Sequence, residues 1–88
     1  MYSLRRTRDG AGDSGGMSNA LKIIDGKIAV VGHRPEVGVA MQVGSLIARS
    51  YSAQDWWTTT TITEILEERE DYVRFKTGNS EYEWRNNG

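Results

Sequence analysis

The stretch "LKIIDGKIAVV", from Leu21 to Val31, carries the strongest fold signal in the chain. Two β-rich runs flank the dipeptide Asp25-Gly26. Aspartate and glycine tolerate the positive φ angles of a type I′ turn, which joins two antiparallel strands through a two-residue loop. The branched apolar residues of both runs, among them Ile23 and Ile28, suit strands. The stretch therefore predicts a tight β-hairpin and points to a β protein.

Further strands are expected downstream of this hairpin. The proline of "GHRPEVG", Pro35, ends pairing and favours extended backbone at the residue before it. The next run alternates, because Val39, Met41, Val43, Ile47 and Tyr51 share one parity. Gly44 predicts a bulge or bend within that strand. A long bent strand is one device by which a small sheet turns into a barrel.

Two readings compete for the segment from Thr58 to Glu67. A run of β-branched residues favours a strand, whereas "TITEILEERE" also fits a helix with a capping box at Thr61 and Glu64. We favour a strand to about Leu66, followed by an acidic turn "EERED", because a second hairpin lies downstream. In that hairpin, "YVRFKTGNSEYEW", Gly78-Asn79 is expected at the tip with a positive φ. Two pairs of residues share one parity on its strands: Val73 with Phe75, and Tyr82 with Trp84.

The fold class that follows is all-β. Eighty-eight residues allow one small domain. About six short strands separated by frequent turns predict a small, partly open barrel, SH3-like or a similar meander, over residues 21–88. Residues 1–20, rich in glycine and charge at their start, are expected to form a disordered tail or an upstream extension.

Three short motifs resemble a pattern in small proteins of phages, bacteria and archaea. They are "PEVGVAMQV" (Pro35 to Val43), "TTITEI" (Thr60 to Ile65) and "TGNSEY" (Thr77 to Tyr82). The similarity runs from Pro35 to Trp84. Those proteins are small β domains without an assigned activity. The resemblance implies a strand at Thr60 to Ile65 and a phage or mobile-element setting, and it transfers no functional residue.

Catalytic chemistry has little support in the sequence. Cysteine is absent and His33 is the only histidine, so thiol nucleophiles are excluded and any triad or histidine-based metal site would rest on one residue. The carboxylates around Glu67 lack the spacing and glycine of a calcium loop. Motifs for phosphate binding or a nucleophile elbow are missing. We therefore expect no enzyme, cofactor or metal. No apolar run is long enough for a membrane helix, and a cytoplasmic location is expected.

The candidate binding residues cluster around two tryptophans. Arg49, Tyr51, Trp56 and Trp57 lie within nine residues, and Arg34 in the loop of His33 to Pro35 adds a second cation. Tryptophan, tyrosine and arginine are enriched at protein-binding hot spots. Adjacent strand residues face opposite sides, so we expect Trp57 to be the more buried and Trp56 the more exposed. The alternative is that both indoles cover the ends of a small core.

Two functions follow from this cluster. The first is a non-enzymatic protein-interaction module, an accessory protein of a phage or mobile element. The second is a single-stranded nucleic-acid binder that stacks bases on aromatic residues, with Lys27 among its cations. The net charge of −1 does not favour the second. Homodimerisation through an edge strand is a third expectation. The identity of the partner and the biological process cannot be read from the residues.

Overall fold

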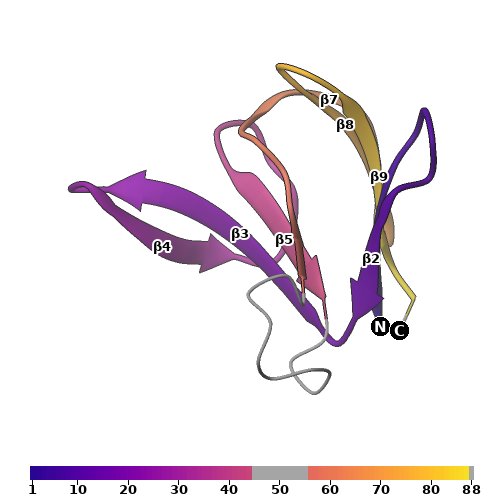
Figure 1. Ribbon diagram of the computed structural model, residues 1–88, viewed down its shortest axis with the longest axis horizontal. Coiled ribbons are helices and arrows are strands. Elements are labelled where there is room, and N and C mark those ends of the chain that lie inside the picture. The colour runs from indigo at the N-terminus through magenta and orange to yellow at the C-terminus, as the bar shows by residue number, and fades with distance from the viewer. Residues whose placement is uncertain (45–55, 88) are drawn as a thin grey trace.

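The computed structural model describes residues 1–44 and 56–87, which form two antiparallel sheets (Figure 1). The five-stranded sheet has the order β2-β1-β9-β8-β7, with β2 at Gly12–Gly15, β1 at Tyr2–Arg6, β9 at Glu81–Asn86, β8 at Tyr72–Thr77 and β7 at Ile62–Arg69. The four-stranded sheet has the order β4-β3-β5-β6, with β4 at Lys27–Gly32, β3 at Met17–Ile24, β5 at Ala40–Gly44 and β6 at Trp56–Thr58. The all-β prediction is confirmed.

Neither sheet closes into a barrel within the described ranges, so the prediction of a small barrel is not confirmed. The sheets meet at the corner between β2 and β3, where Gly16 alone separates the two strands. They are also linked at the start of β7, where the amide of Ile62 donates to the carbonyl of Val39 at 2.8 Å. This contact links the two sheets, but no strand of one sheet pairs with a strand of the other within the described residues. The SH3-like assignment stays a prediction.

The expected disordered N-terminal tail is wrong. Strand β1 is an inner strand of the larger sheet and pairs with both β2 and β9. Leu4 is fully buried, and the ring of Tyr2 lies 5.8 Å from that of Trp84. A turn at Thr7–Asp9 joins β1 to β2, and Asp9 binds both the amide of Ala11 and the guanidinium of Arg6. Residues 1–16 can be polar and still ordered, because only Tyr2 and Leu4 of β1 contribute large apolar side chains to the core.

The core lies between the two sheets and follows the predicted alternation. Its fully or nearly fully buried members are Leu4, Ala20, Val39, Met41, Val43, Ile62, Val73, Phe75, Tyr82 and Trp84. One buried polar chain crosses it: the indole nitrogen of Trp84 donates to the hydroxyl of Ser18 at 3.0 Å, and this hydroxyl donates to the carbonyl of His33 at 2.7 Å. Ser18 thereby ties the smaller sheet to the larger one. The predicted parity partners Ile47 and Tyr51 lie outside the described residues.

The ambiguous segment is a strand, as favoured, but the strand begins and ends later than predicted, and Thr59, Thr60 and Thr61 precede it. Strand β7 runs from Ile62 to Arg69, and only Glu70 and Asp71 form the turn to β8. The acidic residues that were expected in a turn are held on the strand by cations. Glu67 pairs with Arg69 and lies 4.0 Å from Arg74, while Glu68 lies 3.1 Å from Arg34.

The second hairpin is confirmed, although its turn differs from the prediction. Neither Gly78 nor Asn79 has a positive φ. The hydroxyl of Thr77 instead accepts the amides of Asn79 and Ser80 at 3.4 and 3.3 Å. The amide of Thr77 donates to the carbonyl of Ser80 at 2.8 Å and closes the turn. A buried threonine hydroxyl therefore replaces the backbone twist that glycine and asparagine would have supplied.

Candidate protein-interaction surface

The hairpin of β3 and β4 extends beyond the rest of the smaller sheet and forms an arm, residues 21–32 (Figure 1). Strand β5 pairs with β3 only as far as Leu21, so the arm beyond that point has two strands. The turn is the predicted one: Asp25 and Gly26 have φ angles of 53° and 77°, and Ile24 pairs with Lys27 across it. Both positive angles are those a type I′ turn requires.

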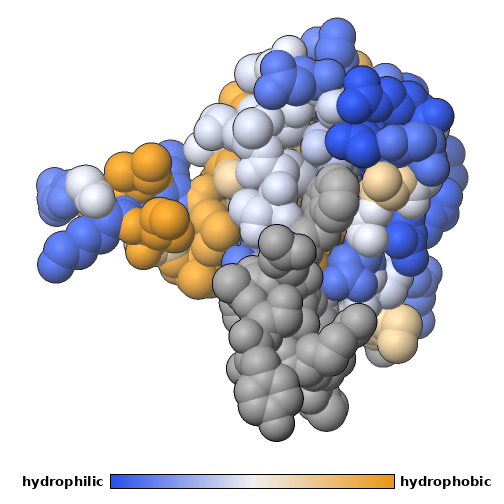
Figure 2. Space-filling model, viewed as in Figure 1, coloured by the Kyte–Doolittle hydropathy of each residue, from blue (hydrophilic) through white to orange (hydrophobic). Residues whose placement is uncertain are grey.

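The arm exposes large apolar side chains, most of all on one face, while Ile24 and Val31 elsewhere on the arm are also exposed, at 48% and 44%. Ile23 pairs with Ile28 and Leu21 with Val30, so these four residues lie on the same side of the hairpin. We call them the apolar face. Ile23, Ile28 and Val30 are 75%, 74% and 60% exposed. Figure 2 shows the projecting arm as the main hydrophobic area in that view. Contiguous exposed apolar patches of this kind mark interaction sites in soluble proteins.

A groove of about 410 Å³ lies where the arm leaves the body of the protein. One wall is the arm itself, with Leu21, Ile23 and Ile28. The other wall consists of small residues, Gly38, Ala40, Thr58 and Thr61. Gly38 has a φ of 96°, which strongly favours glycine, so its lack of a side chain also keeps this wall open. The groove is mostly apolar, with Lys22 as its one ionisable side chain among the described residues.

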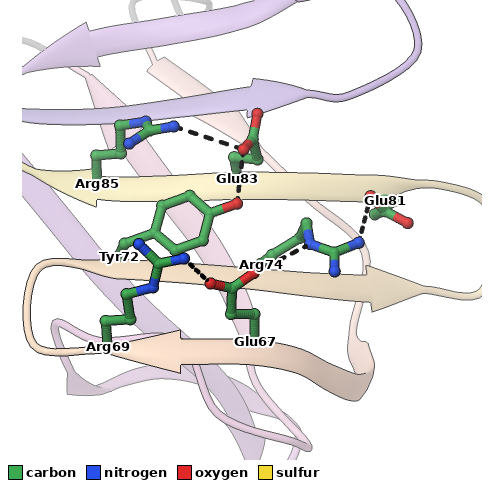
Figure 3. Close-up of polar contacts among 7 residues, drawn as sticks. All are labelled: Glu67, Arg69, Tyr72, Arg74, Glu81, Glu83 and Arg85. Atoms are coloured by element: carbon green, nitrogen blue, oxygen red, sulfur yellow. Dashed lines mark hydrogen bonds and ion pairs between the residues drawn. The ribbon is translucent and has the colours of Figure 1, made fainter.

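The outer face of the larger sheet is, in contrast, covered by charges that neutralise one another (Figure 3). Arg74 lies 3.2 Å from Glu81, and Arg85 lies 3.5 Å from Glu83. The hydroxyl of Tyr72 donates to Glu83 at 2.6 Å. Desolvation by partial burial and the neighbouring Glu83 raise the pKa of Tyr72, and the hydrogen bond to Glu81 raises the pKa of Arg74. Exposed pairs of this type stabilise little, and we interpret this face as a solvated surface.

Arg34, which the sequence suggested as a partner contact, is engaged within the protein. Its guanidinium donates to the carboxylate of Glu68 at 3.1 Å, to the carbonyl of Glu70 at 2.6 Å and to the carbonyl of Arg69. It also lies 5.5 Å from the ring centre of Trp84. These contacts fasten the loop after β4 to the turn between β7 and β8, so Arg34 holds the base of the arm against the larger sheet.

The remaining predicted contact residues are placed only in part. Trp56 and Trp57 begin β6, where they pair with Gly44 and Val43. Their side chains, and Arg49 and Tyr51 entirely, lie outside what the structure describes. The prediction that Trp57 is the more buried indole therefore stays a prediction, and so does a partner site on this segment.

The exposed face of the arm was missed at the level of sequence, although a signal was present. Apolar residues occupy both parities of the arm, as in Ile23-Ile24 and Val30-Val31. Strands that are apolar on both faces need a covering layer on each side. A chain of 88 residues has little material for a third layer, so this hairpin could be expected to lack a full cover within the chain.

Within the described part of the chain, the histidine and the carboxylates form no group of three that could hold a metal ion. His33 is exposed in a bend, and its backbone carbonyl accepts the hydrogen bond from the hydroxyl of Ser18. No helix in residues 1–44 and 56–87 is long and apolar enough to cross a membrane.

Comparisons with known proteins do not identify a family or a function for this chain. No family model, curated protein or solved structure matches the chain. The function must therefore be inferred from the surface itself.

Proposed function

We propose that this protein is a non-enzymatic protein-interaction module that binds its partner through the apolar face of the arm. One observation carries the proposal: Ile23, Ile28 and Val30 are mostly exposed on a hairpin whose turn and register are well formed. Covering one such isoleucine would contribute about 1–2 kcal/mol once its present burial is deducted. A partner that covers the face would recover this free energy several times over.

The character of the groove favours protein over nucleic acid. A nucleic-acid site neutralises phosphates with several lysines or arginines. The groove contains Lys22 as its one described cation, while Arg34 is occupied by three intramolecular bonds. The phage or mobile-element setting and the cytoplasmic location remain predictions from sequence.

The test is a comparison of partner capture by three matched proteins. The arm variant carries Ile23→Thr and Ile28→Thr, since threonine keeps the β-branched shape and removes the apolar end. The control carries Lys76→Thr, an exposed strand position on the larger sheet. All three should unfold within about 0.5 kcal/mol of one another, because the positions are exposed.

Crosslinked or affinity-captured partners from a bacterial lysate are then identified for each protein. We expect the control to retain the partners of the unchanged chain and the arm variant to lose them. Retention of every partner by the arm variant at unchanged yield would overturn the proposal. Trp56→Ala and Trp57→Ala in the same experiment test the segment suggested by the sequence. Loss with these variants alone would move the contact surface from the arm to β6.

A further inference from the structure

We propose that the partner enters the groove with an extended segment, which adds as a short strand beside β3 and carries a carboxylate next to an apolar side chain. This inference rests on the proposed function and names the chemistry of the partner. Three features of the groove support it: the open backbone of β3, the space beside it and the position of Lys22.

The backbone of β3 has an open edge within the groove. Leu21 pairs with Ala40 of β5, and the ladder between the two strands ends there. Ile24 and Lys27 flank a two-residue turn, so they form a hydrogen-bonded pair, and such pairs alternate with non-hydrogen-bonded ones along the hairpin. Ile23 therefore directs its N–H and C=O groups away from β4, toward the side that β5 does not reach.

The chain before β5 turns away from β3 and leaves space for a strand. The amide of Gly38 donates to the carbonyl of Ile62 at 3.0 Å, so this residue is bonded to β7 instead of β3. The volume of about 410 Å³ lies within the usual range of ligand sites, about 300–1,000 Å³. It suits a few residues of an extended chain, whose apolar side chains would contact Leu21, Ile23 and Ile28.

Lys22 places a positive charge at this apolar groove. Its Cε atom lies 4.0 Å from the position that a Cβ atom on Gly38 would occupy, so the side chain reaches the opposite wall. The ammonium group forms no hydrogen bond or ion pair with a described residue. Asp25 lies in the turn and Glu36 in the loop before Gly38, and neither lines the groove. A carboxylate on the partner would pair with Lys22, whereas a basic segment would be repelled.

The three features together favour a peptide over other occupants. A fatty acid could use the apolar walls and Lys22, but it would leave the N–H and C=O groups of Ile23 without a partner. An added strand bonds these groups and places alternate side chains on the two sides of the sheet. The arm of a second copy fits poorly, because its strands bring Lys22 and Lys27 and its one acid, Asp25, lies in a turn.

The first experiment measures the binding of labelled synthetic peptides by fluorescence anisotropy. The probe has about six residues in which valine and glutamate alternate, so valine can lie beside Ile23 and glutamate beside Lys22. Matched peptides carry glutamine or lysine in place of glutamate. We expect saturable binding of the glutamate peptide with a Kd below about 1 mM, at least about tenfold weaker binding of the glutamine peptide and none of the lysine peptide.

Three results would overturn the inference at this stage. The first is the absence of saturable binding by the glutamate peptide. The second is equal binding of the three peptides, which would remove the role of the charge. The third is displacement of the peptide by decanoic acid at lower concentration than by unlabelled peptide, which would make the groove a lipid site.

The second experiment compares matched variants of the chain, with folding verified by circular dichroism. Lys22→Gln should weaken the glutamate peptide about tenfold, whereas Lys27→Gln, on the same arm but outside the groove, should not. Ala40→Leu fills the groove and should abolish binding, whereas Ala29→Leu, which does not line it, should not. If Ala40→Leu does not fold, Lys22→Gln decides. Equal effects of the two lysine variants, or full binding by both groove variants, would overturn the inference.

Hydrogen exchange shows which edge of the arm receives the strand. Binding of the glutamate peptide should slow exchange at the amide of Ile23, which faces the groove. Exchange at Ile28 should not change, because its amide points outward from the free edge of β4. Protection of Ile28 alone would place the peptide on β4. Unchanged exchange at both amides would show that no strand forms, and either result would overturn this geometry.

The two proposals fail in different ways. If the glutamate peptide does not bind while partner capture still depends on Ile23 and Ile28, the acidic strand is wrong and the interaction module stands. If capture does not depend on the arm and the peptide does not bind, both proposals are wrong.

Discussion

Gly12 offers a sharp test of whether the N-terminal segment belongs to the fold. It pairs with Arg5 on β1, and a Cβ atom built on it would lie 1.8 Å from the carbonyl oxygen of Leu4 and 2.8 Å from the carbonyl carbon. Both atoms belong to the backbone, so no side-chain rotation can relieve the clash. Gly12→Ala therefore requires β2 to move away from β1.

The size of the effect follows from what must move. Overpacking by a single methyl group costs about 1–3 kcal/mol, and each ladder hydrogen bond lost adds about 0.5–1.5 kcal/mol. We expect Gly12→Ala to lower the free energy of unfolding by about 3–4 kcal/mol. Gly16 is the matched control: its backbone has no left-handed φ, and a Cβ there meets no atom within 4 Å. Gly16→Ala should leave stability unchanged or raise it by up to about 1 kcal/mol.

Urea unfolding, followed by tryptophan fluorescence and far-UV circular dichroism, measures both variants against the unchanged chain. Hydrogen exchange at the amide of Leu4 gives an independent reading, because opening of β2 should also expose β1. A disordered segment would tolerate alanine equally at both glycines. If Gly12→Ala and Gly16→Ala both lie within about 0.5 kcal/mol of the parent, the placement of β1 and β2 in the sheet is refuted.

Two further predictions concern polar groups. Ser18→Ala should lower the free energy of unfolding by about 2–3 kcal/mol in urea titrations, because it leaves the buried indole N–H of Trp84 without an acceptor; Ser80→Ala is the control, and equal effects of the two would contradict this role. The guanidinium of Arg6 lowers the pKa of Asp9 to about 2 from its ordinary value of about 3.9, so this pair stabilises the fold above about pH 4 and the contribution disappears as the pH falls through 2. An NMR titration of the Asp9 carboxyl should show the low pKa, and Asp9→Asn should reduce the loss of stability between pH 4 and pH 2; titration near the ordinary value would show that the pair does not form in solution.

The sequence allowed prediction of those parts of the fold that depend on local chemistry. Asp25-Gly26 determines its turn through the φ preferences of two adjacent residues. The alternation of Val73 with Phe75 indicates which side of β8 is buried, because strand side chains repeat every second residue. Such signals need no knowledge of the rest of the chain.

The N-terminal strand could not be predicted in this way, because its pairing with β9 is long-range and its local partner β2 is a short polar strand that begins and ends with glycine. Tyr2 and Leu4 show the alternation of a strand, but two residues are too few against a glycine-rich and charged background. The segment is ordered by its pairing with β9, some eighty residues away, where Leu4 lies opposite Trp84. The dipeptide Asp9-Gly10 is typical of a turn, but it predicts a hairpin only when a strand is recognised before it.

The candidate site shows the same division. The hairpin that forms the arm was predicted from its turn, whereas the exposure of Ile23 and Ile28 depends on how far β5 reaches along β3. That length is a property of the assembled sheet. From the sequence, Arg34 is a cation beside a proline and a candidate partner contact. Its intramolecular role could not be predicted, because its carbonyl and carboxylate acceptors come from the β7–β8 region, more than thirty residues away.

The pairing of β1 with β9 has a consequence for synthesis of the protein. The amide of Asn87 donates to the carbonyl of Met1 at 2.7 Å, and Tyr2 lies opposite Asn86. During translation, β1 leaves the ribosome long before its inner neighbour in the sheet exists. The strands of the smaller sheet end at Thr58 and are all synthesised before β9, whereas the larger sheet lacks its central strand until residues 81–86 exist. Leu4 and Tyr2 stay exposed during that interval, so a nascent chain paused before β9 should be a better chaperone substrate than one released after it.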